Sequence, residues 1–186
     1  MFSDQIRPEA KQVLADLKQA GIEKIVVLTG DHASGAEFLR NNLPGLDAIH
    51  AELLPEQKAE IIDQLKAAGY NTAFVGDGVN DAPALVKADV GICMANGADL
   101  ARESAQVILL KDELTALWAA RDVADKTFCV LNTCFSGTVG INTLLLLLAT
   151  SGLLPAAVSA TLHNATTVGL VGYAAAPQRY GAKENK

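Results

Sequence analysis

The sequence predicts an α/β protein, a doubly wound parallel sheet followed by a transmembrane α-helical hairpin. Over about residues 1–126, short β-branched runs alternate with amphipathic helical segments, a pattern typical of a parallel sheet with crossover helices. No Asp, Glu, Lys or Arg occurs from 127 to 178. Two apolar runs in that stretch, at about 130–150 and 156–176, are each long enough to cross a hydrocarbon core of ~30 Å.

The expected elements of the first part follow one another at short intervals. Ser3 or Asp4 is expected to cap a first helix that runs through Ala20. Pro55 is expected to begin the third helix, and Asp112 to cap a long helix after the sheet. Between the first and the last helix, the expected helices span 33–40, 55–69, 82–87 and 98–104. The expected strands span 24–28, 46–53, 72–75, 90–94 and 106–110. Because ligands of such sheets bind beyond the carboxyl ends of the strands, residues that follow strands are the candidates for a site.

Charge divides the chain into three parts. Residues 1–126 carry 12 Lys and Arg against 20 Asp and Glu, and an acidic segment without a basic patch predicts no nucleic-acid partner. The charge-free part covers 127–178, and residues 179–186 form a basic tail. Basic residues flank the two apolar runs while their connecting turn has none, so the positive-inside bias places 1–126 and the C-terminus in the cytoplasm. We therefore expect a multi-pass protein of the plasma membrane, in contact with the lipid bilayer; the alternative is a buried helical hairpin in a soluble fold.

The most informative stretch is residues 74–85, which read FVGDGVNDAPAL. Asp77 and Asp81 stand four residues apart across a tight turn that follows an apolar run. Gly76 and Gly78 permit backbone angles and close approaches that a side chain would prevent. Two oxygen ligands held in this way suit Mg²⁺, which takes its remaining ligands from water and a substrate phosphate. The loop is therefore predicted to hold a metal ion and a phosphate; the alternative is a solvated turn between strand and helix.

Three further groups carry possible chemistry. The turn Thr29-Gly30-Asp31 follows a predicted strand and offers a hydroxyl and backbone N–H donors to a phosphoryl oxygen. Lys58 lies in the first turn of a predicted helix, where it would either neutralise phosphate charge or lie solvated at the surface. In the second apolar run, the polar side chains either bind a transition metal or join helices by hydrogen bonds, and both interpretations stay open. These side chains are His163, Asn164, Thr166 and Thr167.

Five motifs, in their order and spacing, resemble the P-type ATPases. They are Thr29-Gly30-Asp31, LPEQK at 54–58, GDGVNDAPAL at 76–85, ADVGI at 88–92 and ARESA at 101–105, the last two resembling the heavy-metal-transporting branch. The resemblance implies that 1–126 is an incomplete haloacid-dehalogenase-like phosphorylation domain, that 127–178 holds the last two membrane helices, and that 179–186 is a cytoplasmic tail. It also implies that Asp77 and Asp81 hold or position Mg²⁺. Asn80 would shape the loop, Thr29 and Lys58 would contact the phosphoryl group, and Gly30, Asp31, Gly76 and Gly78 would border the bound cofactor.

One motif of that family is absent. Its reaction passes through an aspartyl phosphate formed on a DKTGT motif, which does not occur here. Asp125-Lys126-Thr127 shares the first three letters, but it lies on a predicted helix after the sheet. We expect the C-terminal segment of an ATP-driven pump for a transition-metal cation. Its partner would be the N-terminal part of the same pump, which would supply the nucleophile and bind most of the ATP, so this segment alone would be inactive. The alternatives are a freestanding membrane-tethered phosphatase of the same fold and a non-catalytic subunit of a pump.

Overall fold

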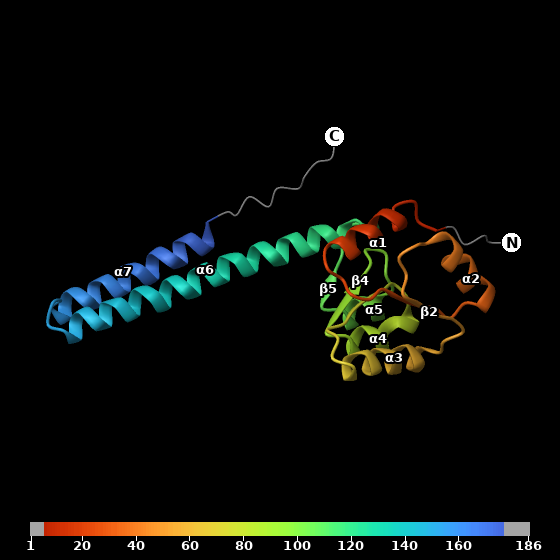
Figure 1. Ribbon diagram of the computed structural model, residues 1–186, viewed down its shortest axis with the longest axis horizontal. Coiled ribbons are helices and arrows are strands. Elements are labelled where there is room, and N and C mark those ends of the chain that lie inside the picture. The colour runs from red at the N-terminus through yellow and green to blue at the C-terminus, as the bar shows by residue number, and fades with distance from the viewer. Residues whose placement is uncertain (1–5, 177–186) are drawn as a thin grey trace. The chain divides into compact units, whose positions relative to one another are not determined.

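The computed structural model describes residues 6–176, and its internal contacts divide the chain between Leu117 and Trp118 (Figure 1). The first of the two units contains the predicted sheet, and the second contains the apolar helices. The predicted tail at 179–186 lies outside the described residues. The predicted cap at Ser3 or Asp4 is wrong, because the first helix begins at Ala10 with Glu9 at its N-cap position.

The first unit alternates short strands with helices, and every strand pairing in its described part is parallel. The predicted α/β class is therefore confirmed. The strands are β1 (Val26–Leu28), β2 (Ala48–His50), β3 (Ala73–Gly76), β4 (Val90–Cys93) and β5 (Val107–Ile108). The helices are α1 (Ala10–Gln19), α2 (Ala33–Asn42), α3 (Pro55–Ala67), α4 (Ala82–Lys87) and α5 (Asp99–Ser104), with a 3₁₀ turn η1 (Val79–Asp81) before α4.

The strands form two sheets rather than a continuous one. β1 pairs with β2, while β3, β4 and β5 form a second sheet in that order. The two sheets share a core, since Leu28 of β1 and Phe74 of β3 both pack against buried Ile62, Ala84 and Ala88. β1 and β3 therefore pack against the same core, although they belong to different sheets.

Several predicted boundaries are wrong, for identifiable reasons. The strand expected over 46–53 covers only Ala48–His50, because Glu52 adopts a left-handed backbone (φ 58°) that a strand cannot continue through. The long helix α6 begins at Ala116, so Asp112 does not cap it. Asp112 instead accepts hydrogen bonds from the Arg7 guanidinium, at 2.7 Å through its carbonyl oxygen and 3.2 Å through Oδ1. This long-range pair joins the two ends of the unit and has no signature in local sequence.

Asp89 fixes the start of β4 against the start of β3. Its Oδ2 accepts hydrogen bonds from the backbone N–H (2.8 Å) and the hydroxyl (2.9 Å) of Thr72, and its Oδ1 lies 2.9 Å from Lys66 Nζ. The backbone hydrogen bond from Thr72, then Lys66 and the Thr72 hydroxyl, lower the pKa of Asp89 to about 2. The folded state therefore favours the ionised form of this carboxylate.

We expect Asp89→Asn to lower the melting temperature of the full chain in detergent micelles at pH 6, and to lower it less at pH 3. A carboxylate whose pKa falls on folding stabilises the protein above its unfolded pKa of about 3.9, and loses that effect as the pH falls through the folded value. The matched control is Asp63→Asn, whose carboxylate pairs only with the exposed Lys87. An equal deficit for Asp89→Asn at both pH values would contradict the assignment.

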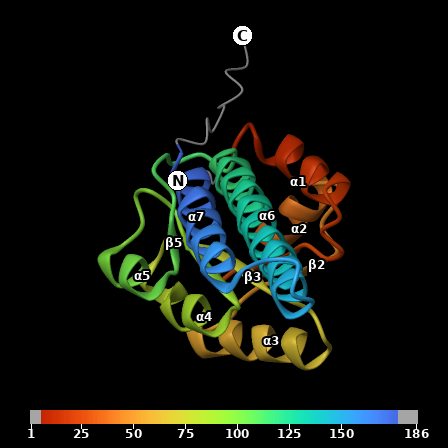
Figure 2. The ribbon, with the colours of Figure 1, turned by 90° about the vertical axis from the view of Figure 1, so that its left-hand side faces the viewer.

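The second unit is a hairpin of two helices, α6 (Ala116–Thr150, which enters it at Trp118) and α7 (Ala156–Ala175), side by side in both ribbon views (Figure 2). The chain reverses through Gly152, with φ 77°, and Pro155 precedes α7. A Cβ at Gly137 of α6 would lie 3.4 Å from Leu170 of α7, so the glycine permits close packing there.

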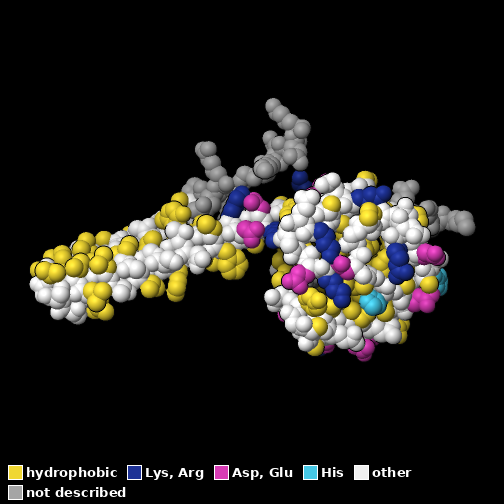
Figure 3. Space-filling view, viewed as in Figure 1, with side chains coloured by type: hydrophobic (Ala, Val, Ile, Leu, Met, Phe, Trp, Pro, Cys, Tyr) yellow, Lys and Arg dark blue, Asp and Glu magenta, His cyan; other side chains and the backbone are white. Residues whose placement is uncertain are grey.

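Among the described residues, α6 is the one helix long and apolar enough to cross a membrane. Its outward-facing side chains are large and hydrophobic, with Phe128, Leu131 and Phe135 more than half exposed. The face in Figure 3 shows the charged side chains on the first unit and near the start of the second, while the rest of the hairpin is hydrophobic or neutral. At 20 residues α7 has the length of a membrane span. Its polar residues, including His163 and Asn164, keep its mean hydropathy below that expected of a membrane-spanning helix.

Candidate active site

The loop that follows β3 turns back over the end of its own strand. Gly76 ends β3, and a Cβ at this position would lie 2.8 Å from Asp81 Cβ and 3.0 Å from its Oδ2. A side chain would push the carboxylate away, so glycine is required for this close approach. The sequence predicted that Gly76 would let a ligand approach closely, and the structure shows that the group lying against it is the Asp81 side chain.

Asp81 is held from two sides. Its Oδ1 lies 2.8 Å from Lys58 Nζ, and its Oδ2 accepts backbone hydrogen bonds from Gly78 (3.1 Å) and Asp77 (3.3 Å). The Lys58 and Asp81 side chains are only 10% and 13% exposed. The surface-lysine interpretation of Lys58 is therefore wrong. A nearly buried ion pair with two extra hydrogen bonds leaves Asp81 little freedom to move.

Asp77 is arranged differently. Asp77 is exposed, and its carboxylate has no hydrogen-bond or ion-pair partner among the described residues. The backbone, in contrast, is fixed, because the Asp77 carbonyl accepts a hydrogen bond of 2.8 Å from Ala98 N–H. Asp77 thus presents a free carboxylate from a fixed backbone, and a carboxylate oxygen is a ligand that Mg²⁺ accepts.

The β4–α5 loop supplies that support, and the sequence did not reveal it. Met94 N–H donates to the Gly76 carbonyl at 3.2 Å. A Cβ at Gly97 would collide with Cys93 Sγ and lie 3.3 Å from the Asp77 carbonyl, so Gly97 lets the loop approach Asp77. Cys93 is completely buried, and burial raises the pKa of its thiol. Cys93 is therefore part of the core.

The Thr29 turn lies at the carboxyl end of β1. The Thr29 hydroxyl donates to Asp31 Oδ2 at 2.7 Å, and the Asp31 N–H donates back to the hydroxyl at 3.0 Å. Leu53 N–H donates to the Thr29 carbonyl at 3.1 Å, and a Cβ at Gly30 would lie 3.4 Å from the Leu53 carbonyl. Leu53 lies two residues before the start of α3, which carries Lys58, so the Thr29 turn is joined to the segment that leads into that helix.

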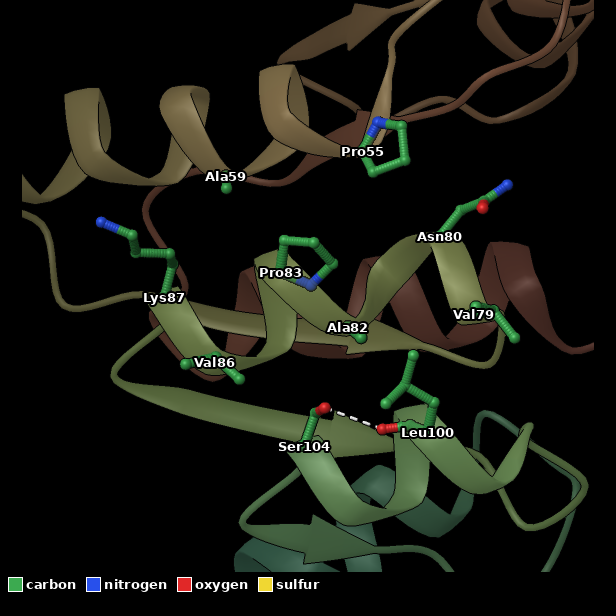
Figure 4. Close-up of a pocket in the computed structure, with 10 residues that line it drawn as sticks. All are labelled: Pro55, Ala59, Val79, Asn80, Ala82, Pro83, Val86, Lys87, Leu100 and Ser104. Carbon is green, nitrogen blue, oxygen red and sulfur yellow. Dashed lines mark hydrogen bonds between the residues drawn. The ribbon is translucent and has the colours of Figure 1, made fainter.

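The predicted residues thus form two groups. Thr29 and Asp31 lie after β1, and Asp77 and Asp81 lie after β3, with Lys58 paired to Asp81. No hydrogen bond among the described residues joins Thr29 directly to Lys58 or Asp81. Asn80 is exposed beside this site and borders an open apolar hollow between α3, α4 and α5, with Pro55 and Pro83 (Figure 4). Its predicted role in shaping the loop stays a prediction.

Three of the four polar residues of α7 have hydrogen-bond partners within the hairpin. His163 Nδ1 lies 2.8 Å from Asn142 Oδ1 of α6, which is the inter-helix hydrogen bond of the alternative interpretation. The hydroxyls of Thr166 and Thr167 donate to carbonyls of their own helix, at 2.9 and 3.0 Å. The metal path through these residues stays a prediction.

The loop after β3 offers one free and one internally bonded carboxylate. In the described part of the chain, no three His, Cys, Asp or Glu side chains gather where they could hold a metal ion. One free carboxylate beside one fixed carboxylate fits an ion that keeps several waters and shares its other ligands with a phosphate, as Mg²⁺ does. The donor set therefore fits Mg²⁺ with a phosphorylated substrate, and does not form a closed metal cage.

The model of the haloacid dehalogenase-like hydrolase family matches residues 2–89, which include β1, β2, β3 and the acidic loop. The chain is 40% identical over 178 residues to a zinc-exporting P-type ATPase of Mycobacterium marinum, and 39% identical over 178 residues to a manganese-exporting P-type ATPase of Mycobacterium leprae. Each alignment covers 95% of this chain and 24% of the relative.

A crystal structure of a zinc-transporting PIB-type ATPase in the E2.Pi state superposes with a TM-score of 0.84 at 30% identity, covering 92% of this chain and 28% of that one. The chain is homologous to the C-terminal part of heavy-metal-transporting P-type ATPases. It spans about a quarter of the length of the curated relatives it matches.

Proposed function

We propose that this chain forms the Mg²⁺ side of the phosphorylation site, and the last two membrane helices, of a pump that moves a transition-metal cation at the expense of ATP. The observation that carries the proposal is the Lys58–Asp81 ion pair, which fixes the loop and leaves the Asp77 carboxylate free. The 40% identity to a zinc-exporting P-type ATPase supports the same function.

Each residue of the site has a distinct task in this proposal. Asp77 binds the cation, and Asp81 keeps the loop in place through Lys58 and the backbone of Gly78. The Lys58 ammonium and the Thr29 hydroxyl, now donated to Asp31, are the donors nearest to an arriving phosphoryl group. Bound Mg²⁺ supplies neutralisation of the phosphoryl charge. The nucleophilic carboxylate and most of the ATP site come from outside residues 1–186, so the chain alone does not hydrolyse ATP.

The hairpin provides part of the cation path in the plasma membrane. Both α6 and α7 cross the bilayer, with the first unit and the C-terminus in the cytoplasm. With His163 Nδ1 engaged by Asn142, the other ring nitrogen remains for a cation, and imidazole is a ligand for most transition metals. The relatives named above export zinc in one case and manganese in the other, so the proposed cargo is a class of cation.

A chimera tests the function directly. The matching C-terminal segment of the Mycobacterium marinum zinc exporter is replaced by this chain, and the membranes are labelled with γ-³²P-ATP and Mg²⁺. We expect a phosphoenzyme in the chimera and background labelling after Asp77→Asn, because that substitution removes the one free carboxylate of the loop. Asp63→Asn is the matched control, because Asp63 pairs with Lys87 and forms no bond with the loop, and it should label normally.

Two results would support the alternatives instead. Phosphatase turnover by the isolated chain, lost on Asp77→Asn, would indicate a freestanding phosphatase. Normal labelling of the Asp77→Asn chimera would show that the carboxylate is not needed, as expected of a non-catalytic subunit.

A further inference from the structure

The Thr29 turn is held by the segment that follows β2. We propose that Glu52, which lies in that segment, is a positioning residue: its left-handed backbone orients the Thr29–Gly30 peptide so that the Gly30 N–H can bind a phosphoryl oxygen. That the ligand is a phosphoryl group rests on the proposed function, whereas the orientation of the peptide rests on the backbone contacts below.

Glu52 has a backbone conformation that is unusual for its residue type. Its φ is 58°, and among the described residues no other residue except glycine has a positive φ. Residues with a Cβ resist this region, and such positions concentrate at functional sites. The Glu52 side chain is 61% exposed, and its carboxylate makes only long contacts, at 3.4 Å to the Ala33 N–H and 3.6 Å to His32 Nδ1. The side chain therefore does not account for the conformation.

The conformation of Glu52 turns two consecutive N–H groups in one direction. Glu52 N–H donates to the Asp31 carbonyl at 2.9 Å, and Leu53 N–H donates to the Thr29 carbonyl at 3.1 Å. In an extended strand successive N–H groups point to opposite sides, so a strand through Glu52 could make only one of these bonds. A left-handed residue in a turn brings successive N–H groups to the same side. Both bonds therefore depend on the conformation of Glu52.

These bonds hold the Thr29 turn at more than one point. The Thr29 N–H donates to the His50 carbonyl at 2.9 Å, so the segment from His50 to Leu53 makes three backbone hydrogen bonds to the turn. A Cβ at Gly30 would lie 3.4 Å from the Leu53 carbonyl oxygen, so the two backbones are in close contact. The Thr29–Gly30 peptide cannot rotate without breaking its bond to Leu53.

The orientation of this peptide decides where the Gly30 N–H points. No described peptide bond is cis, and in a trans peptide the N–H and the C=O point in opposite directions. Since the Thr29 carbonyl points to Leu53, the Gly30 N–H points away from that segment. Gly30 is exposed, and its N–H has no hydrogen-bond acceptor among the described residues. An outward N–H of this kind is a donor that suits a phosphoryl oxygen.

The test uses the full chain in detergent micelles with Mg²⁺, titrated with inorganic phosphate while the amide signals are followed by NMR. Sodium chloride at equal ionic strength is the control for the anion. In the wild type, phosphate should shift the Gly30 amide signal, and the amides of Glu52 and Leu53 should exchange slowly with solvent.

Glu52→Val should raise the dissociation constant for phosphate about tenfold, because β-branched residues resist the left-handed region and a hydrogen bond to a charged group is lost. Exchange of the amides at positions 52 and 53 should become about tenfold faster or more. Glu52→Gly and Glu52→Gln are the matched variants, and both should bind phosphate as the wild type does. Glycine adopts the left-handed conformation freely, and glutamine removes only the charge.

A second readout separates positioning from a general loss of structure. Mn²⁺ in place of Mg²⁺ should broaden the Asp77 amide signal equally in the wild type and in Glu52→Val, because Ala98 and not this segment holds the Asp77 carbonyl. Equal losses at Asp77 and Gly30 in a folded Glu52→Val protein would contradict the proposal. If Glu52→Val does not fold, the glycine and glutamine variants decide, and normal phosphate binding by both supports the backbone role.

Three further results would overturn the proposal: phosphate does not shift the Gly30 signal in the wild type, Glu52→Val binds phosphate normally, or Glu52→Gly and Glu52→Gln lose binding. The last result would assign the effect to the carboxylate. No readout needs ATP or the nucleophile, so the proposed function is tested separately. The expected phosphate binding together with an unlabelled chimera would reject only the function. A labelled chimera together with normal phosphate binding by Glu52→Val would reject only the role of Glu52.

Discussion

Lys58→Met is expected to destabilise the first unit by about 3 kcal/mol. The side chains of the Lys58–Asp81 pair are 10% and 13% exposed, and removing one partner of such a pair leaves a nearly buried, unpaired charge, at a cost of about 3–5 kcal/mol. The lower end applies because Asp81 keeps its hydrogen bonds from the backbone of Gly78 and Asp77. Methionine preserves the apolar stem, so the loss reports the charge. Urea denaturation of the full chain in micelles, followed by circular dichroism, measures it.

The matched control is Lys87→Met. Lys87 pairs with Asp63 at 2.9 Å, but both side chains are about half exposed, and exposed pairs contribute at most about 1 kcal/mol. The double substitution Lys58→Met with Asp81→Asn should be less destabilised than Lys58→Met alone, because no lone charge remains. Similar losses for Lys58→Met and Lys87→Met would show that the active-site pair is not the constraint described here.

Gly91→Ala is expected to cost about 3 kcal/mol in the same assay. A Cβ at Gly91 would collide with the backbone carbonyl oxygen of Leu85 and lie 2.8 Å from Gln106 Oε1. Neither can withdraw easily, since Leu85 is completely buried and Gln106 Oε1 accepts the Gly91 N–H at 2.5 Å. Overpacking of this kind typically costs 1–3 kcal/mol, and a rigid backbone oxygen places the cost at the upper end.

Gly35→Ala is the control for that substitution. Gly35 lies in α2, where the nearest atom to an added Cβ is Asp31 Cβ at 3.7 Å, an ordinary contact. Alanine favours a helix over glycine by about 1 kcal/mol, so Gly35→Ala should leave stability unchanged or raise it. If Gly91→Ala were equally harmless, the packing of β4 against α4 would have to differ from that in the structure.

Local patterns predicted the elements well and the contacts between them poorly. The helix over 82–87 was predicted with both its ends correct, and Pro55 begins α3 as expected, because proline and apolar periodicity act over a few residues. Lys58 and Asp81 are 23 residues apart, and nothing in their neighbourhoods indicates that they pair. The same limit applies to Asp112. The local pattern predicts that it caps a helix, whereas in the structure it pairs with Arg7, 105 residues away in sequence.

The site shows the same division. The acidic loop, Thr29 and Lys58 were identified from residue types and from the resemblance, but the different roles of the two aspartates required the structure. Both carboxylate oxygens of Asp81 are engaged in internal bonds. The Asp77 carboxylate is free, because Ala98 bonds only to the Asp77 backbone carbonyl. The interruption between β1 and β3 was also beyond the pattern, since periodicity predicts strands but not which strands pair.

The central claim, that Asp77 is the free cation ligand of a loop fixed by Lys58 and Asp81, is tested most directly with Mn²⁺ as a paramagnetic substitute for Mg²⁺. Mn²⁺ and inorganic phosphate are added to the full chain in micelles, and broadening of the amide NMR signals is mapped. The account predicts the strongest broadening at Asp77 and Gly78, lost in Asp77→Asn and kept in Asp63→Asn. Broadening centred elsewhere, or unchanged in Asp77→Asn, would contradict it.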